Sequence, residues 1–214
     1  MDGSEDIQTD MKNFVKNFKT VNYSMYKEPI FDKKSLIWFT DGSCIKNGKT
    51  NSSAGYASSC VNGFKKGLII YGKLDDKLIK ATNIRAEGMA IQSVFENVIK
   101  NNKSSDWNSA VIYTDSEFWV KMIYNYMPKW SSQTFDVKAN PDLSKRIWKL
   151  YNEINKAKHI QLVHIYGHNK DNSASSKDII KRFCHDNNAL VDELANIARH
   201  EKDYVQKNYY IHDN

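Results

Sequence analysis

The chain has 214 residues, of which 41% are hydrophobic and 12% aromatic, enough to fill a core and to exclude a wholly disordered chain. Its formal net charge of +6 suits a polyanion partner, although a basic balance also serves solubility alone. Three scattered cysteines without a CxxC pair argue against a zinc site or a disulfide framework.

No apolar run approaches the roughly 20 residues of a membrane span. The acidic N-terminus is unlike a secretory or transit signal, so we expect a soluble protein of the cytoplasm or nucleus.

The elements expected along the chain follow the order β-β-β-α-β-α-α-β-α. Residues 1–34 lack sustained periodicity and are predicted to form a flexible or loosely docked arm. We expect strands at 36–40, 54–61 and 67–73, a helix at 83–100, a strand at 110–114, helices at 117–126 and 141–156, a strand at 159–166 and a helix at 187–200. A meander followed by βα units predicts an α/β fold with a mixed sheet and helices on both faces. The main domain would span 35–202, and 203–214 would be a C-terminal tail.

Two predicted strands end on an aspartate, Asp41 and Asp115. If these strands are parallel neighbours, both carboxylates meet at the edge of the sheet where ligands gather. Close carboxylates repel one another unless protons or cations neutralise them, and oxygen ligands suit Mg²⁺ or Mn²⁺ rather than zinc. An aspartate after a strand also commonly caps a helix or opens a turn, so neither residue alone decides.

Two more acidic residues lie early in predicted helices. Glu87 follows Ala86 on a stripe that faces the core, and Asp192 lies early in the last helix. Either residue alone is more often a solvated helical residue. Four such carboxylates in a basic chain are what a two-metal site requires.

Five segments carry a resemblance to a known family. In order, FTDGSC (39–44), TNIRAEGMA (82–90), IYTDSEFWV (112–120), VHIYGH (163–168) and NALVDELANIA (188–198) resemble the motifs of type 1 ribonuclease H across about residues 35–200. The resemblance implies a ribonuclease H-like fold with a mixed five-stranded sheet. It also implies an endonuclease that hydrolyses the RNA strand of RNA–DNA hybrids, leaving 5′-phosphate and 3′-hydroxyl ends. By motif match, two Mg²⁺ ions, or Mn²⁺ instead, are held by Asp41, Glu87, Asp115 and Asp192.

The same resemblance assigns residues around the carboxylates. His168 matches the histidine of the family's mobile loop, which assists proton movement or product release, and His185 is the alternative. Contacts near the minor groove, where the 2′-hydroxyl distinguishes RNA from DNA, are expected from Ser43, Cys44, Asn47, Asn83 and Gln92, and Asn188 is also expected to bind substrate. Contacts to the DNA strand are expected from Lys80, Thr82, Asn140, Phe118 and Tyr126, with Lys121, Lys129 and Trp130 as further backbone contacts. Ordinary helix packing and a solvated basic face are the alternatives for Phe118, Tyr126 and this last group.

The chain departs from the family's pattern in three places. Ile84 stands where a polar residue is usual, the basic loop before Asn140 is short, and the stretch 168–188 is longer than the family's compact loop. Besides a hybrid-specific endonuclease, two interpretations compete: a resolvase or exonuclease of the same superfamily, and an inactive nucleic-acid-binding module. The TN-R-AE and DGSC segments disfavour the former, and the four carboxylates disfavour the latter. We expect the partner to be an RNA–DNA hybrid, with no membrane association, and the protein to be monomeric.

Overall fold

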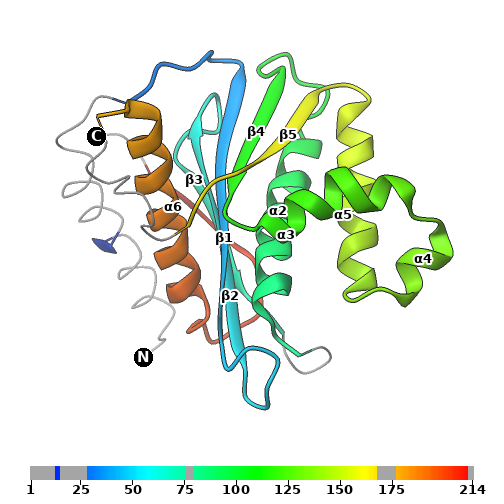
Figure 1. Cartoon of the computed structure of the whole chain (residues 1–214). Coiled ribbons are helices and arrows are strands. Elements are labelled where there is room, and N and C mark those ends of the chain that lie inside the picture. Colours follow the sequence, from blue (N-terminus) through cyan, green and yellow to red (C-terminus); the bar gives the residue numbers. More distant parts are fainter. Residues whose placement is uncertain (1–12, 15–27, 76–79, 168–176, 212–214) are drawn as a thin grey trace.

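The computed structural model describes residues 13–14, 28–75, 80–167 and 177–211 (Figure 1). Its elements are β1 (Ser35–Ile45), β2 (Ser53–Asn62), β3 (Leu68–Lys73), α2 (Asn83–Ile99), β4 (Ser109–Thr114), α3 (Glu117–Lys121), a π-helical turn η1 (Met122–Tyr126), a 3₁₀ turn η2 (Met127–Lys129), α4 (Ser132–Val137), α5 (Pro141–Asn155), β5 (His159–His164), α6 (Ile179–Ala198) and β6 (Lys207–Tyr210). None of the helices described is both long and apolar enough to cross a membrane.

The strands form one mixed sheet in the order β5-β4-β1-β2-β3-β6, which confirms the predicted α/β class. β1, β4 and β5 run parallel, while β2, β3 and β6 extend the sheet antiparallel from β1. The sheet has six strands rather than the expected five, because Lys207–Tyr210 pairs with the free edge of β3. This segment is only four residues long, and its strand conformation depends on backbone pairing with β3, so periodicity gave no signal for it.

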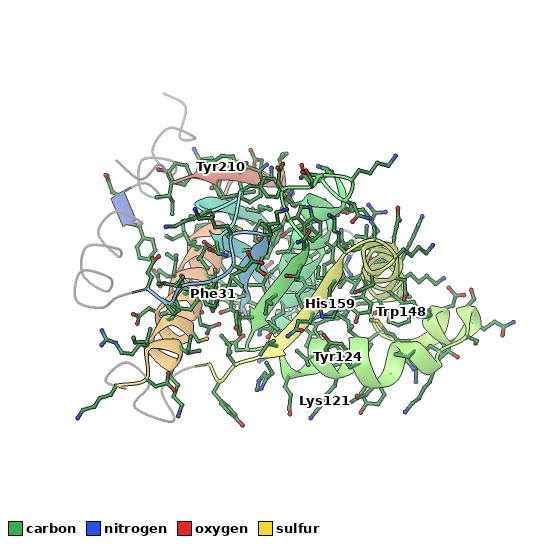
Figure 2. The ribbon with its side chains drawn as sticks, turned by 90° about the horizontal axis from the view of Figure 1, so that it is seen from above. Phe31, Lys121, Tyr124, Trp148, His159 and Tyr210 are labelled. Atoms are coloured by element: carbon green, nitrogen blue, oxygen red, sulfur yellow. The ribbon has the colours of Figure 1, made fainter. Side chains whose placement is uncertain are left out.

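Helices cover both faces of the sheet, as expected (Figure 1). Successive strand side chains alternate between the faces, so Trp38 packs under α2 while Phe39 packs under α6. The α2 face is the larger core, because α5 also packs on it. On the α6 face, Phe31 from the segment before β1 lies against Phe183 with ring centroids 5.3 Å apart (Figure 2).

Two glycines allow helix termini to approach the sheet backbone. A Cβ on Gly42 of β1 would lie 2.3 Å from the backbone nitrogen of Glu87. A Cβ on Gly55 of β2 would lie 2.4 Å from the backbone nitrogen of Arg199, at the end of α6. Neither contact leaves room for a side chain, so these glycines fix where α2 and α6 sit relative to β1 and β2.

Several elements differ from the sequence-based expectation, among them β5, which ends at His164 rather than 166. β1 does not stop at Asp41 but continues to Ile45, because β2 pairs with it beyond the point where β4 ends. The last helix begins at Ile179 rather than 187, where the Asp178 side chain accepts the backbone N–H groups of Ile180 and Lys181. A short helix, α4, forms where a loop was expected, with Ser131 as its N-cap.

Candidate active site

The first two predicted site residues, Asp41 and Asp115, meet where the parallel pairing of two inner strands of the sheet ends. β1 and β4 are parallel neighbours whose register ends with Thr40 opposite Thr114, which confirms the expected arrangement. Asp41 and Asp115 are the next residues in each chain segment and therefore lie side by side. Asp41 is only 4% exposed, whereas Asp115 is half-buried.

Asp41 lies in an acidic, buried environment. Burial raises the pKa of Asp41 well above its usual range, and the charges of Asp115, Asp192 and Glu87 raise it further. The backbone N–H of Gly42 donates to Asp41 Oδ1 at 2.6 Å and opposes the rise. Asp115, Asp192 and Glu87, contributed by the end of β4, by α6 and by α2, are therefore all within electrostatic reach of Asp41 in β1.

Glu87 is held by two hydrogen bonds. Ser116 Oγ donates to Glu87 Oε2 at 2.5 Å, and Asn83 Nδ2 donates to Oε1 at 2.7 Å. Burial raises the pKa of Glu87 to about 7; the Ser116 hydrogen bond opposes this rise, and the charge of Asp115 adds to it. The predicted early position on a helix is confirmed for Glu87, the fifth residue of α2. For Asp192 it is wrong, because α6 begins at Ile179 and Asp192 is the fourteenth of its 20 residues.

Asn188 enters this cluster from α6, one turn before Asp192. It is 5% exposed, and its Nδ2 lies 3.5 Å from Asp115 Oδ2. Its Oδ1 is buried and has no hydrogen-bond partner among the described residues. We expected Asn188 to contact substrate, whereas the structure places its amide against a carboxylate.

The described donor set fits a hard divalent cation, since it consists of four carboxylates and an amide oxygen. The raised pKa of Asp41 and the unpaired Asn188 Oδ1 are both features that a cation would relieve. In the described part of the chain, no three His, Cys, Asp or Glu side chains yet stand close enough to enclose an ion. Ligation would therefore require these side chains to draw closer together.

Of the two candidate histidines, the structure describes His185 but not His168. His168 lies outside the described residues, but Gly167 before it touches Asp115: a Cβ there would lie 2.3 Å from Oδ2. His185 lies within α6, where its Nδ1 is 3.0 Å from Asp186 Oδ1.

The loop after β1 meets the start of α2. Asn47 Oδ1 accepts the backbone N–H of Asn83 at 3.0 Å, and Cys44 Sγ lies 3.6 Å from the carbonyl oxygen of Ala81. Three predicted minor-groove residues, Cys44, Asn47 and Asn83, are thus brought together. Gln92 lies further along α2, where it donates to Glu96 at 3.1 Å.

An arginine that the sequence analysis did not single out joins two of the predicted DNA contacts. Arg85 donates its backbone N–H to Thr82 Oγ1 and its Nη1 to Asn140 Oδ1, both at 3.2 Å. The same guanidinium forms a two-pronged pair with Asp142. Arg85 lies in the TNIRAE segment, three residues after the N-cap Thr82. This position in the motif was the feature of the sequence that could have indicated its role. Lys80 is exposed nearby in sequence.

The predicted aromatic contacts differ in exposure. Phe118 is 41% and Tyr126 51% exposed, so both present ring surface to solvent. Trp130 instead packs edge-on against Phe135, with centroids 5.1 Å apart. Of the lysines predicted as further backbone contacts, Lys121 points outward (Figure 2) but pairs with Glu117 at 2.8 Å, and Lys129 is exposed.

Comparison with known proteins agrees with this geometry. The RNase H family model matches residues 33–200. Ribonuclease H1 of Mus musculus is 28% identical over 138 residues, covering 63% of this chain and 45% of that protein. Ribonuclease H of Schizosaccharomyces pombe is 25% identical over 179 residues, covering 78% and 59%. The chain thus spans about half the length of these curated relatives.

Solved structures share the fold. The native prototype foamy virus protease–reverse transcriptase superposes with a TM-score of 0.59 at 19% identity, covering 83% of this chain and 23% of that one. LC9-RNase H1, a type 1 RNase H with the type 2 active-site motif, superposes with a TM-score of 0.51 at 16% identity, covering 80% of this chain and 74% of that one.

Proposed function

Because this chain belongs to the RNase H family of nucleases, we propose that it hydrolyses the RNA strand of RNA–DNA hybrids. The observation that carries the proposal is the gathering of Glu87, Asp115 and Asp192 around Asp41, where β4 ends beside β1. Each carboxylate also stands in its family motif, in the expected order.

The four carboxylates and the Asn188 oxygen would hold two Mg²⁺ ions, with Mn²⁺ as the alternative. When bound, such ions activate a water and stabilise the departing 3′ oxygen, so the products would carry 5′-phosphate and 3′-hydroxyl ends. The protein's own contribution is orientation: Gly42 positions Asp41, and Ser116 and Asn83 position Glu87.

His168 is our candidate for moving a proton at this site. The contact between Gly167 and Asp115 supports it, because the chain reaches the carboxylates directly before residue 168. His185 is the alternative and lies seven residues before Asp192 on the same helix. Loss of activity on His168→Ala, with His185→Ala near normal, would support the first assignment, and the reverse result would favour the second.

Distinguishing a hybrid from other duplexes would depend on reading both strands. The joined Asn47 and Asn83 offer amide groups for 2′-hydroxyls of the RNA. Across the α2 side, Thr82 and Asn140 would bind phosphates of the DNA strand, and Lys80 would contribute charge. The exposed rings of Phe118 and Tyr126 would pack on deoxyribose, where a 2′-hydroxyl would clash.

The test is cleavage of a labelled RNA–DNA hybrid in Mg²⁺, alongside duplex RNA, duplex DNA and the Asp115→Asn variant. We expect cleavage of the hybrid alone. We also expect a ligase to join the RNA fragments, because ligation requires the 5′-phosphates that this reaction would leave. Equal cleavage of the duplex controls would favour a nuclease of another specificity. Binding without cleavage would favour an inactive nucleic-acid-binding module, and full activity in Asp115→Asn would contradict the assigned site.

A further inference from the structure

A polar stripe on α6 leads away from the carboxylates toward the end of the helix. Asp192, Asn196 and Arg199 follow one another at spacings of four and three residues, so they lie on one side of α6. In β1, Asp41 and Ser43 are two residues apart and point to the same face, the face that α6 covers. The stripe therefore runs alongside the Asp41–Ser43 segment.

Arg199 is fixed in place at the end of this stripe. Its Nη1 donates to Ser43 Oγ at 2.8 Å and to Asn196 Oδ1 at 2.7 Å, while Ser43 Oγ donates to the same Asn196 oxygen at 2.5 Å. The Arg199 carbonyl accepts from Ser53 Oγ at 2.9 Å, and Gly55 lets its backbone lie against β2. Side chain and backbone are thus both anchored to the sheet.

Unlike Arg85 and Arg146, Arg199 has no carboxylate partner within the described residues. Arg85 pairs with Asp142 and Arg146 with Glu96, which compensates those charges. Among the described residues, the guanidinium of Arg199 donates to Ser43 Oγ, to Asn196 Oδ1 and, from Nε at 3.4 Å, to His200 Nε2, none of which is a carboxylate. No described residue accepts from its second terminal nitrogen, Nη2, so that side of the fork offers two donors and a full positive charge.

The position of Arg199 relative to the carboxylates matches the spacing of a nucleic-acid strand. Arg199, the C-cap of α6, is seven positions after Asp192, a rise of about 10 Å, which corresponds to about three nucleotides at about 3.4 Å each. The residues proposed for the DNA strand, such as Thr82 and Asn140, belong to α2 and α5 on the other face of the sheet. The strand that passes over the α6 side is then the RNA.

We propose that Arg199 binds a phosphate of the RNA strand about three nucleotides from the cleaved bond, with Ser43 and Asn196 as residues that position its guanidinium. The inference rests on the proposed function and extends it to a residue outside the carboxylate cluster. It also changes the role expected of Ser43, whose hydroxyl proton is already donated to Asn196.

The first test measures hybrid binding in the Asp115→Asn background, across a salt series, for Arg199→Gln and Arg199→Lys. We expect about tenfold weaker binding for Arg199→Gln and a salt slope smaller by about 0.9, the value for one lost phosphate contact. Arg199→Lys keeps the charge and most of the slope, but cannot bond Ser43 and Asn196 as a planar fork does. Lys103→Gln, an exposed lysine just after α2, at the opposite end of the sheet, is the charge-matched control and should change neither value.

The second test locates the contact on the RNA. One methylphosphonate linkage, placed after a 2′-deoxynucleotide for stability, removes a single phosphate charge; the same deoxynucleotide with an ordinary phosphate is the control. At the contacted position the neutral linkage should weaken binding by wild type about tenfold and leave Arg199→Gln unchanged. Losses that simply add at every position would overturn the proposal.

A purely structural role for Arg199 makes a different prediction. Arg199→Gln would then lower the melting temperature and kcat, while KM and the salt slope stayed as in wild type, and this result would also overturn the proposal. Failure of the underlying function would show separately, because the wild-type protein itself would then leave the hybrid uncut.

Discussion

Glu87 and Asp41 are neighbours in one site, yet their surroundings differ. Glu87 receives hydrogen bonds from two side chains, Ser116 and Asn83, which hold both of its oxygens. Within the described part of the chain, Asp41 receives a hydrogen bond only from the adjacent Gly42 backbone; it is also more deeply buried and faces three other carboxylates. Glu87 is therefore positioned by the protein alone, whereas Asp41 carries an electrostatic cost that the protein leaves uncompensated.

This difference indicates that the two sides of the site have different roles: the α2 side orients a carboxylate, and the α6 side attracts a cation. Donors on the α2 side orient a carboxylate before any ligand arrives. On the α6 side, Asp41, Asp192 and the unpaired Asn188 oxygen form a region where a cation would be stabilised most. The four predictions below test whether the two sides differ in this way.

The largest effect is expected from Asp41→Asn. Hydrolysis of a hybrid should fall by about a thousandfold or more, because an essential ligand is lost. Without metal, the free energy of unfolding should rise by about 1–2 kcal/mol, because a buried charge repelled by three others is removed. Activity assays and urea denaturation in EDTA measure the two effects.

A matched control for this variant is Asp136→Asn, which neutralises an exposed aspartate that pairs with Lys145. We expect a change in stability within about 0.5 kcal/mol and normal activity. Lower stability of metal-free Asp41→Asn would contradict our view that Asp41 is uncompensated.

The dependence of stability on pH should be large in the metal-free protein. The pKa of Glu87 rises from 4.5 to about 7 on folding, so the folded protein binds this proton more tightly than the unfolded chain. The free energy of unfolding should therefore be highest below about pH 4.5 and fall by about 2–3 kcal/mol as the pH rises to about 7.

The control for this titration is Glu87→Gln, and the difference between its stability profile and that of wild type isolates one carboxyl from the others. Mg²⁺ at pH 7 should restore stability to wild type, since the cation replaces the proton. Parallel profiles for the two proteins would show that Glu87 already has an ordinary pKa.

Sequence patterns located the carboxylates because their positions depend on local features. A short apolar run before Asp115 and a helical stripe around Glu87 are visible in the chain itself, and the order of motifs tied them to one fold. The parallel pairing of β1 with β4 was only a conditional expectation, yet it is what brings Asp41 beside Asp115.

Features that depend on distant partners were not visible. β6 forms because β3 offers an unpaired edge, and β1 extends past Asp41 because β2 pairs with it. Arg85 and Arg199 gained their roles from Asn140 and Ser43, far away in sequence. Since nothing in a single chain's local pattern encodes such pairings, only the folded structure shows them.

A smaller effect is expected from Ser116→Ala, which removes one of the two donors to Glu87. We expect about a tenfold loss of activity and about 1 kcal/mol of stability, because Ser116 also caps α3. Ser131→Ala removes a similar cap from α4, which holds none of the four site carboxylates, and should lower stability without lowering activity. Equal activity in the two variants would show that Glu87 needs no help from Ser116.

The smallest effect is expected from Asn188→Leu, which replaces a buried amide by an apolar group of similar size. Its Oδ1 has no partner and its Nδ2 makes only a 3.5 Å contact with Asp115, so little is lost in the metal-free protein. If that oxygen is reserved for a cation, the Mg²⁺ concentration for half-maximal activity should rise severalfold while metal-free stability stays within about 1 kcal/mol. An unchanged Mg²⁺ requirement would instead show that Asn188 is a packing residue. The cation would then be bound on this side of the site by Asp41, Asp115 and Asp192 without the amide oxygen.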